Sequence, residues 1–362
     1  MNKKILIITI LLTIIGVLMI YSSSEIWAEY KFGDSFRYLK YQGMFGIVGL
    51  FIMLFLSKIN LNFLKKKSNL IFFGCVILLI LVLIPGIGTV RNGSRSWFGL
   101  GGFGIQPSEF MKIALIIFTS KYLEKNKRDM KNIKAGVFPI LLLSCMVFGL
   151  IMLQPDLGTG VIIMVTIIAM LFISGVKISF FASIGIVGIL GIIGLILIAP
   201  YRINRILSFI DPWKDPLGTG FQIIQSLYAI GPGGLFGLGF GNSRQKHFYL
   251  PEPQTDFIFS IICEELGFFG SSLVVILFFV LAYDGFKTAR KCNDLFKKYL
   301  AFGITFCLIF QATLNLMVVV GLIPVTGVTL PFLSYGGSSL LISMASIGIL
   351  LNISRKKQKT HL

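Results

Sequence analysis

Long uncharged hydrophobic stretches alternate with short polar segments along almost the whole chain. A helix needs about 20 apolar residues to cross the hydrocarbon of a membrane. Uncharged stretches of roughly this length lie at 5–24, 41–57, 68–90, 135–155, 157–176, 178–201 and 266–283. The hydrophobic pattern therefore predicts a membrane-spanning helix over each of these stretches.

Two further regions complete the predicted bundle. Residues 110–122 form a shorter apolar segment that contains Lys112, and residues 299–354 carry no charge but are far too long for one crossing. Glycines and prolines between 321 and 337 interrupt the latter, which predicts two helices joined by an outer loop. The predicted fold class is an all-α integral membrane protein with ten transmembrane helices. It forms a single polytopic membrane domain over 1–362, with a large outer loop at approximately 202–256 between helices 7 and 8.

Basic residues gather in alternate loops. Six lie between Lys121 and Lys134 against two acids, and five lie between Asp284 and Lys298 against two acids. Because Lys and Arg are enriched in cytoplasmic loops, this alternation predicts that both termini are cytoplasmic. On that topology the cytoplasmic side holds 22 bases and 4 acids, whereas the outer side holds 11 of each. The first stretch has no clear small-x-small cleavage site after it and is interpreted as a retained helix rather than a signal peptide.

Composition narrows the function classes. Hydrophobic residues make up 55% of the chain and charged residues 13%, with a mean hydropathy of +0.87, which is more apolar surface than a soluble core can bury. The net charge of +18 equals the cytoplasmic excess and is interpreted as a topology signal, so nucleic-acid binding loses its support. Binding of anionic inner-leaflet lipids stays open. Five cysteines without CxxC spacing and only two histidines argue against structural zinc, a disulfide scaffold and multi-His metal sites.

Polar residues at the predicted outer helix ends are the candidates for chemistry, because a charge at mid-membrane depth costs roughly 2.5–3.5 kcal/mol. Glu109 and Lys112 have the i,i+3 spacing at which a carboxylate and an ammonium pair on a helix. The pair is either purely structural or part of a functional cavity. Asp156, in a tight turn, either caps the next helix or borders the same cavity.

The predicted outer loop and the last connection add further candidates. The glycine-rich run 231–241 lacks the strand–turn–helix context of a dinucleotide site, so close backbone packing or a re-entrant turn is favoured. Asp256 stands where a helix is expected to begin, and it can serve as the N-cap of this helix, as a general base, or as both. Segment 327–339 is uncharged but rich in hydroxyls, and it either holds a phosphate or sugar or merely turns the chain.

Four motifs resemble those of one family. They are Gln106-Pro-Ser-Glu109-x-x-Lys112, Gln154-Pro-Asp-Leu-Gly-Thr159, Leu250-Pro-Glu-Pro-Gln-Thr-Asp-Phe-Ile-Phe259 with Glu264-Glu-Leu-Gly267, and Pro331-Phe-x-Ser-Tyr-Gly-Gly-Ser-Ser339. In this order they are similar to the SEDS family of FtsW, RodA and SpoVE, and the resemblance covers essentially the whole chain. Segments 251–256 and 326–331 resemble the FtsW/SpoVE branch, and segment 241–250 is most similar to the SpoVE subgroup.

The resemblance implies a peptidoglycan glycosyltransferase that polymerises lipid II into glycan strands at the outer face of the bacterial cytoplasmic membrane, for cell division or spore cortex synthesis. It implies a class B penicillin-binding protein as partner, with other divisome or sporulation membrane proteins, and no nucleic acid. The family's essential aspartate corresponds to Asp256, which is expected to be the general base. The diphosphate leaving group needs positive charge rather than a second acid.

The remaining site residues fall into two expected groups. Candidates for binding the diphosphate or sugar are Arg95, Arg205, Arg244, Lys246, Ser334 and Ser338. Residues expected to shape the cavity are Glu109, Lys112, Asp156 and Glu264. No cofactor is certain, and a divalent cation, Mg or Mn, is left open to help the diphosphate. The alternative functions are a lipid II flippase, whose buried charges would line a path, and a non-catalytic scaffold for the transpeptidase.

Overall fold

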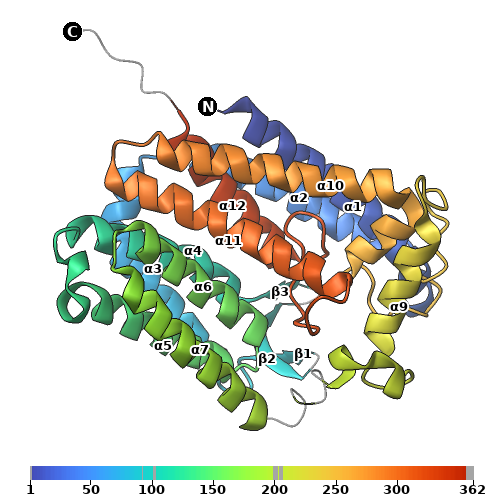
Figure 1. Cartoon of the computed structure of the whole chain (residues 1–362). Coiled ribbons are helices and arrows are strands. Elements are labelled where there is room, and N and C mark those ends of the chain that lie inside the picture. Colours follow the sequence, from blue (N-terminus) through green and yellow to red (C-terminus); the bar gives the residue numbers. More distant parts are fainter. Residues whose placement is uncertain (1, 92, 101–102, 199–202, 204–206, 356–362) are drawn as a thin grey trace.

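The computed structural model describes residues 2–91, 93–100, 103–198, 203 and 207–355. Helices dominate this part of the chain, and most of them run side by side (Figure 1). The long helices are α1 (Lys3–Phe32), α2 (Arg37–Leu56), α3 (Leu61–Leu81), α4 (Pro107–Lys125), α5 (Phe138–Met152), α6 (Leu157–Ile173), α7 (Ile178–Ile198), α10 (Ile258–Arg290), α11 (Leu295–Val319) and α12 (Gly337–Ile353). A long helix overlaps each region for which the hydrophobic pattern predicts one.

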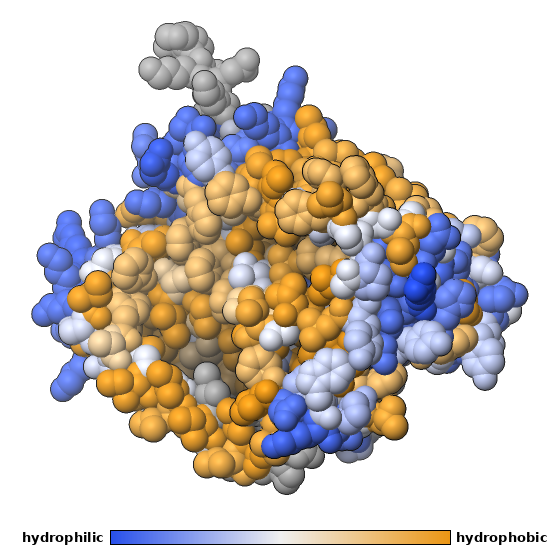
Figure 2. Space-filling model, turned by 45° about the vertical axis from the view of Figure 1, so that its right-hand side comes forward, coloured by the Kyte–Doolittle hydropathy of each residue, from blue (hydrophilic) through white to orange (hydrophobic). Residues whose placement is uncertain are grey.

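Several of these helices have the composition of membrane spans. Within the described residues, five segments are long and apolar enough to cross a membrane, namely Lys3–Phe32, Arg37–Leu56, Ile133–Met152, Ile258–Arg290 and Leu295–Val319. The apolar helices α6, α7 and α12 are shorter by this measure, and α3 and α4 carry charges within their first two turns. Figure 2 shows hydrophobic side chains over the middle of the visible face and hydrophilic ones towards its ends. The chain is therefore a mostly helical, multi-pass membrane-type protein.

A small antiparallel sheet between α3 and α4 corrects the all-α expectation. Its strands are β1 (Thr89–Arg91), β2 (Ser94–Leu100) and β3 (Phe103–Ile105), paired in that order. Helix α3 ends at Leu81, before Pro85 and the glycines that follow it, so the helix predicted to reach residue 90 stops earlier. The β-branched Thr89 and Val90 favour a strand instead, and Gly93 supplies a positive φ of 79° at the turn.

Short elements fill two of the connections. The predicted outer loop contains η3 (Pro212–Lys214), α9 (Phe221–Ile230) and η4 (Gly231–Gly233), and α9 packs on α10. The connection between α4 and α5 contains η1 (Asp129–Lys131) and the π-helical turn η2 (Ile133–Val137). Both connections are thus more ordered than the hydrophobic pattern alone indicates.

The two ends of the bundle are distinct. The backbone N–H of Asn2 donates to Ser354 Oγ at 2.9 Å, which joins the start of α1 to the end of α12. Lys65 Nζ lies 2.6 Å from Glu124 Oε2 and links the start of α3 to the end of α4. The sheet and α9 lie at the opposite end (Figure 1). The groups expected on one side of a membrane therefore share one end of the fold.

Helices α4 and α11 form the interior of the bundle. Helix α11 packs against α4, α6, α10 and α12, and α4 also packs against α3. Met111 and Leu115 of α4 and Leu300 of α11 are fully buried, as expected for helices with neighbours on several sides. A polar side chain on the buried face of either helix is therefore confined inside the protein.

Helix α1 makes a close backbone approach to the segment before α12. A Cβ atom on Gly16 would lie 2.4 Å from Phe332 O and 2.7 Å from Leu333 Cα. Phe332 itself has a φ of 68°, an unusual conformation for a bulky residue that surrounding contacts must maintain. The glycine therefore lets α1 support the segment that follows Pro331.

We expect Gly16→Ala to lower the free energy of unfolding by about 1–3 kcal/mol, because backbone must move to admit the methyl group. Gly43→Ala in α2 is the matched control, since its Cβ would meet no atom within 4 Å. That control should be neutral or stabilising by up to about 1 kcal/mol through helix propensity. Thermal unfolding in detergent compares the two variants, and equal transition temperatures would show that the close approach is dispensable.

Candidate active site

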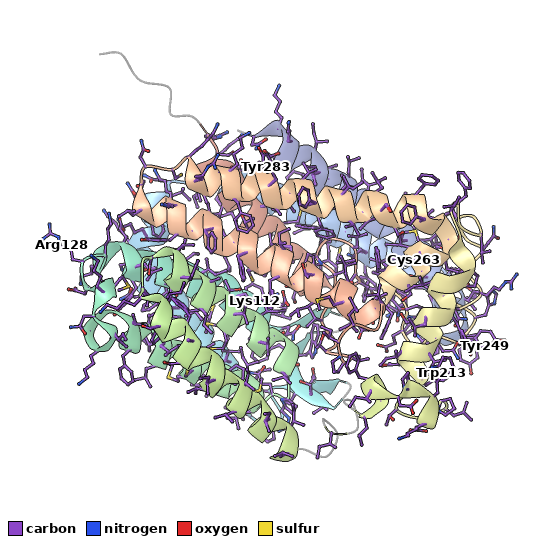
Figure 3. The ribbon with its side chains drawn as sticks, viewed as in Figure 1. Lys112, Arg128, Trp213, Tyr249, Cys263 and Tyr283 are labelled. Atoms are coloured by element: carbon purple, nitrogen blue, oxygen red, sulfur yellow. The ribbon has the colours of Figure 1, made fainter. Side chains whose placement is uncertain are left out.

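The ammonium of Lys112 lies buried between α4 and α11. Lys112 Nζ is 2.8 Å from Glu109 Oε2 and donates to Gln311 Oε1 at 2.6 Å, and both charged side chains are only 6% exposed. The predicted i,i+3 ion pair is therefore present. Figure 3 shows Lys112 inside the bundle. Because removing one member would leave a buried charge without a counter-charge, the pair strongly constrains how α4 and α11 meet.

The same contacts continue into the segment before α12. Gln311 Nε2 donates to the carbonyl oxygen of Thr329 at 2.9 Å, and the Thr329 hydroxyl lies 3.1 Å from Ser339 Oγ. The side chain of Gln311 thus accepts from Lys112 and donates to segment 327–339. One amide connects the charged motif on α4 with the hydroxyl-rich motif.

Asp256 lies just ahead of α10 and does not cap it. The helix begins at Ile258, its N-cap position is Phe257, and no side chain makes a capping hydrogen bond there. The interpretation of Asp256 as an N-cap is therefore wrong, because the helix begins one residue later than a cap at Asp256 requires. Asp256 is half-buried, and the Thr255 hydroxyl donates to its Oδ1 at 2.9 Å.

Asn315 fixes the backbone of Asp256. Asn315 Nδ2 donates to the carbonyl oxygen of Asp256 and to that of Val328, each at 2.7 Å. The amide carries two hydrogens, so it can make both bonds at once. Because Asn315 is 1% exposed within α11, this clamp holds the segment before α10 against the segment before α12.

Asp156 caps α6 and also contacts the motif on α4. Its Oδ1 accepts from the backbone N–H of Thr159 at 3.1 Å, which confirms the predicted cap, and its Oδ2 accepts from Gln106 Nε2 at 3.0 Å. Burial raises the pKa of the Asp156 carboxyl above its ordinary value, an effect that the hydrogen bonds from Thr159 oppose. Asp156 therefore joins two of the four motifs.

Ser334 and Ser338 are both held by protein contacts. Ser334 Oγ accepts from the backbone N–H of Leu330 at 2.8 Å. Ser338 Oγ accepts from the backbone N–H of Gln106 at 3.2 Å and donates to the carbonyl oxygen of Gly104 at 3.0 Å. Each serine is 4% exposed. In this arrangement the Ser334 hydroxyl closes a local turn, and the Ser338 hydroxyl holds the start of α12 against β3 and the start of α4. A role of either serine in binding sugar stays a prediction.

Helix α10 is interrupted at Gly267, and the glycine-rich run 231–241 forms hydrogen bonds with the backbone groups on both sides of the interruption. Gly267 has φ 63° and ψ −160°, which interrupts the helical hydrogen bonds. Leu238 and Gly239 donate backbone hydrogen bonds to the carbonyl oxygens of Glu264 and Glu265 at 2.9 and 3.0 Å. Further N–H groups past the break donate to carbonyl oxygens in the run 233–237. Close backbone packing is therefore confirmed, and these backbone groups are already occupied rather than free to cradle a phosphate.

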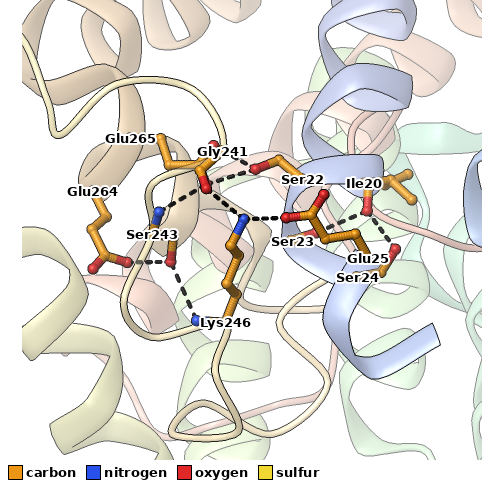
Figure 4. Close-up of polar contacts among 10 residues, drawn as sticks. All are labelled: Ile20, Ser22, Ser23, Ser24, Glu25, Gly241, Ser243, Lys246, Glu264 and Glu265. Carbon is orange, nitrogen blue, oxygen red and sulfur yellow. Dashed lines mark hydrogen bonds and ion pairs between the residues drawn. The ribbon is translucent and has the colours of Figure 1, made fainter. Parts of the chain in front are cut away.

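Glu264 and Glu265 attach the loop after this run to the broken helix (Figure 4). Glu264 accepts from Ser243 Oγ at 2.5 Å and from the Arg244 backbone N–H at 2.9 Å. Glu265 accepts from the Ser243 backbone N–H at 3.1 Å and from Ser22 Oγ at 2.6 Å. Both carboxylates are fully buried. Glu264 thus shapes the loop that carries Arg244.

Lys246 is buried in an ion pair across the same cluster (Figure 4). Its Nζ lies 2.5 Å from Glu25 Oε1 on α1 and donates to the carbonyl oxygen of Gly241 at 2.6 Å. The residue is 4% exposed. In this arrangement the ammonium neutralises Glu25 and links the outer loop to α1. The positive charge of Lys246 is therefore balanced by a carboxylate within the protein.

The predicted arginines differ in their surroundings. Arg244 is exposed, while its backbone is fixed by Glu264. Arg95 on β2 is half-buried and its Nη1 lies 3.5 Å from the carbonyl oxygen of Leu83. Arg205 lies outside the described residues. Two of the three arginines are therefore placed at the end of the molecule that carries Asp256.

Several polar atoms around Asp256 lack hydrogen-bond partners. Within the described part of the chain, Gln254 Oε1, Asn315 Oδ1 and Thr326 Oγ1 are buried and unsatisfied. A buried acceptor without a partner typically costs about 1–3 kcal/mol, so such a group suggests a site that a ligand or water completes. Their grouping on the segments next to Asp256 makes this region the best candidate for an active site.

Comparison with known proteins identifies the family of the chain. Residues 2–359 match the model of the FtsW, RodA and SpoVE family, described as cell cycle proteins. The chain is 52% identical to stage V sporulation protein E of Bacillus subtilis (strain 168), over 96% of this chain and 95% of that protein. It is 42% identical to the probable peptidoglycan glycosyltransferase FtsW of Geobacter sp. (strain M18), over 97% and 96%. The chain belongs to this family.

Solved structures share the fold. A chain from a structure on the structural coordination of polymerization and crosslinking by a peptidoglycan synthase complex aligns with a TM-score of 0.80 at 30% identity, covering 98% of this chain and 97% of that one. The rod shape determining protein RodA of Thermus thermophilus aligns with a TM-score of 0.71 at 27% identity, covering 97% and 95%. The SEDS resemblance predicted from the motifs is thereby confirmed.

Sequence reasoning missed the neutral residues that hold this SEDS site together. Gln311, Asn315 and Gln42 are buried in helices and donate to carbonyl oxygens of segments 254–256 and 327–334. The available signal was an amide side chain inside an otherwise apolar span, since such a group needs a partner in the bundle. Glu25 was missed because its partner Lys246 is far away in sequence.

The described residues offer few side chains that could bind a metal ion together. Among the described residues, no group of three or more His, Cys, Asp or Glu side chains is arranged to hold one. The divalent cation left open by the sequence therefore stays a prediction, and a diphosphate would have to supply part of its coordination.

We expect Lys112→Met to lower the free energy of unfolding by about 3–5 kcal/mol, because it leaves the Glu109 carboxylate buried without its counter-charge. The double variant Glu109→Gln/Lys112→Met should recover much of that loss, since no charge then remains. Chemical or thermal unfolding of the single and double variants measures the coupling. Additive losses from the two substitutions would contradict a coupled buried pair.

Proposed function

We propose that this chain is a peptidoglycan glycosyltransferase that polymerises lipid II at the outer face of the bacterial cytoplasmic membrane. The observation that carries the proposal is the half-buried carboxylate of Asp256, whose backbone is clamped by Asn315 among unsatisfied buried acceptors. Membership of the SEDS family and the name of the Geobacter relative support it. A carboxylate on a fixed backbone beside unsatisfied polar groups is suited to act as a general base on a bound substrate.

The proposed reaction needs one base and a cation near the leaving group. Asp256 takes the proton from the acceptor's sugar hydroxyl as this hydroxyl attacks the anomeric carbon of the donor. The bond to undecaprenyl diphosphate breaks on the opposite face, so the configuration inverts. Arg244 and Arg95 are the described candidates for stabilising the departing diphosphate, because guanidinium groups match phosphate oxygens well. Lys246 is less suited, since its ammonium already pairs with Glu25.

We infer a topology in which all ten long helices cross the membrane, with both termini cytoplasmic and the segment at about 202–256 outside. The separation of charge supports this arrangement, because the two termini and alternate connections together carry 22 bases and 4 acids. Among the shorter or charged helices, α4, α6 and α12 pack against α11, and α3 packs against α4. Two lipid substrates with polar heads can reach such an outer site sideways from the leaflet.

The partner we propose is a class B penicillin-binding protein that cross-links the glycan. The support is the similarity to a chain of a peptidoglycan synthase complex that coordinates polymerization and crosslinking. Identity to stage V sporulation protein E favours spore cortex synthesis over septal wall as the product, with other sporulation membrane proteins nearby. Expression timing distinguishes these two roles.

A lipid II flippase is the main alternative function, and a non-catalytic scaffold is the other. A translocation path needs charged or polar groups through the depth of the membrane. Glu25, Glu264 and Glu265 instead contact the outer-loop segment that follows α9, and Asp256 lies in the same loop. The Glu109–Lys112 pair inside the bundle is neutralised within itself. This distribution favours chemistry at the outer surface.

The test is glycan polymerisation by the purified chain with its cognate penicillin-binding protein and lipid II. Asp256→Asn and Asp256→Ala should reduce the rate by about 10²–10⁴-fold, the usual contribution of a general base. Asp211→Asn, a half-buried residue of the same outer loop, is the control and should polymerise at the native rate. Thermal unfolding confirms that all variants are folded.

Three outcomes separate the functions. Undiminished polymer from Asp256→Asn contradicts the general-base role. Flipping in proteoliposomes by a native complex that never polymerises supports the transporter. A native complex that does neither, while another polymerase depends on its presence, supports the scaffold.

A further inference from the structure

A cavity opens at the end of the molecule opposite the candidate active site. Its volume is about 530 Å³, and its cationic lining residues are Arg128, Lys131, Lys134 and Lys177. Figure 3 places Arg128 at the end of the molecule away from Trp213 and Tyr249. Three of the four cations come from the connection between α4 and α5, and Lys177 comes from the turn between α6 and α7. Two connections far apart in sequence therefore contribute to one basic cavity.

The charge of this cavity is largely uncompensated. Asp129 is its single acidic lining residue against the four cations. Within the described residues, none of the four cations belongs to an ion pair with a carboxylate. Like charges held together raise the local positive potential and attract an anion. An anion in the cavity would lower this repulsion.

The cavity wall is an ordered piece of structure. Met130 is 1% exposed and packs in the hydrophobic core, while the neighbouring cations stay outside. The Tyr122 hydroxyl donates to the carbonyl oxygen of Gly136 at 3.0 Å. A Cβ atom on Gly136 would lie 2.2 Å from Asp129 O, so the loop is tightly wound. The cations are therefore presented by a fixed backbone rather than by a loose chain.

Exposed apolar side chains adjoin the cations along the sequence. Ile133 lines the cavity and is 41% exposed, and Phe138 and Ile178 begin α5 and α7 with exposures of 56% and 76%. Bases beside exposed apolar helix starts are typical of the zone where lipid headgroups meet hydrocarbon. A ligand with a phosphate and acyl chains fits both features, whereas a soluble anion uses only the first.

We propose that this basic cavity binds the phosphate group of an anionic phospholipid in the adjacent leaflet. The four cations hold the phosphate, and the acyl chains lie along the exposed starts of α5 and α7. The topology inferred above makes this the cytoplasmic leaflet. Binding here does not depend on the reaction proposed for the outer end.

The experiment measures lipid binding to the full chain in detergent by native mass spectrometry. The probes are phosphatidylglycerol, phosphatidylcholine and inorganic phosphate. The cavity variant carries Arg128→Gln, Lys131→Gln, Lys134→Gln and Lys177→Gln. The matched control carries Lys58→Gln, Lys66→Gln, Lys67→Gln and Lys291→Gln, which are exposed cations of the same end outside the cavity. Both variants lose four charges, so effects of total charge on topology or folding are equal.

We expect the native chain and the control to bind phosphatidylglycerol in preference to phosphatidylcholine, and the cavity variant to bind it at least about tenfold more weakly. Equal affinity of the cavity variant and the control would overturn the site. Binding of inorganic phosphate to the cavity without binding of phosphatidylglycerol would overturn the lipid as its source. All these readouts are independent of polymerisation.

Discussion

A single buried ammonium constrains the candidate active site. Lys112 lies inside a bundle of apolar helices, where it needs both a counter-charge and a hydrogen-bond acceptor. Glu109 provides the first from its own helix, and Gln311 provides the second from α11. Because Gln311 also binds segment 327–339 and Asn315, one helical turn further on, binds Asp256, the position of α11 relative to α4 decides where the candidate base lies.

Buried backbone groups also need hydrogen-bond partners, and the break in helix α10 shows how they find them. A helix that stops inside a bundle exposes carbonyl and N–H groups that neither lipid nor apolar side chains can satisfy. The glycine-rich run supplies those hydrogen bonds, and the missing side chain of Gly237 lets the run approach Gly267 closely. The outer loop is thereby part of the helical bundle, and the buried pair of Lys246 and Glu25 fastens it to α1.

The sequence predicted the parts whose signals are local. Uncharged stretches of membrane length located the helices, and the i,i+3 pair of Glu109 and Lys112 could be inferred from helix geometry alone. The sheet at 89–105 was missed because its first two residues lie in the predicted helix 68–90 and the rest lie in a connection to which hydropathy assigns no element. Asn315 and Lys246 could not be assigned in advance, since each acts through a partner that only the tertiary fold brings near.

The two ends of the molecule have different proposed roles. In our proposals, cations at one end set the orientation in the membrane and hold a lipid phosphate, and balanced charges at the other end shape a site for sugar chemistry. The most direct measurement is a structure of the chain with an acceptor lipid II and an unreactive donor analogue. The account predicts the Asp256 carboxylate within about 2.6–3.2 Å of the attacking sugar hydroxyl. An acceptor hydroxyl held by another residue, with Asp256 facing the diphosphate, would contradict it.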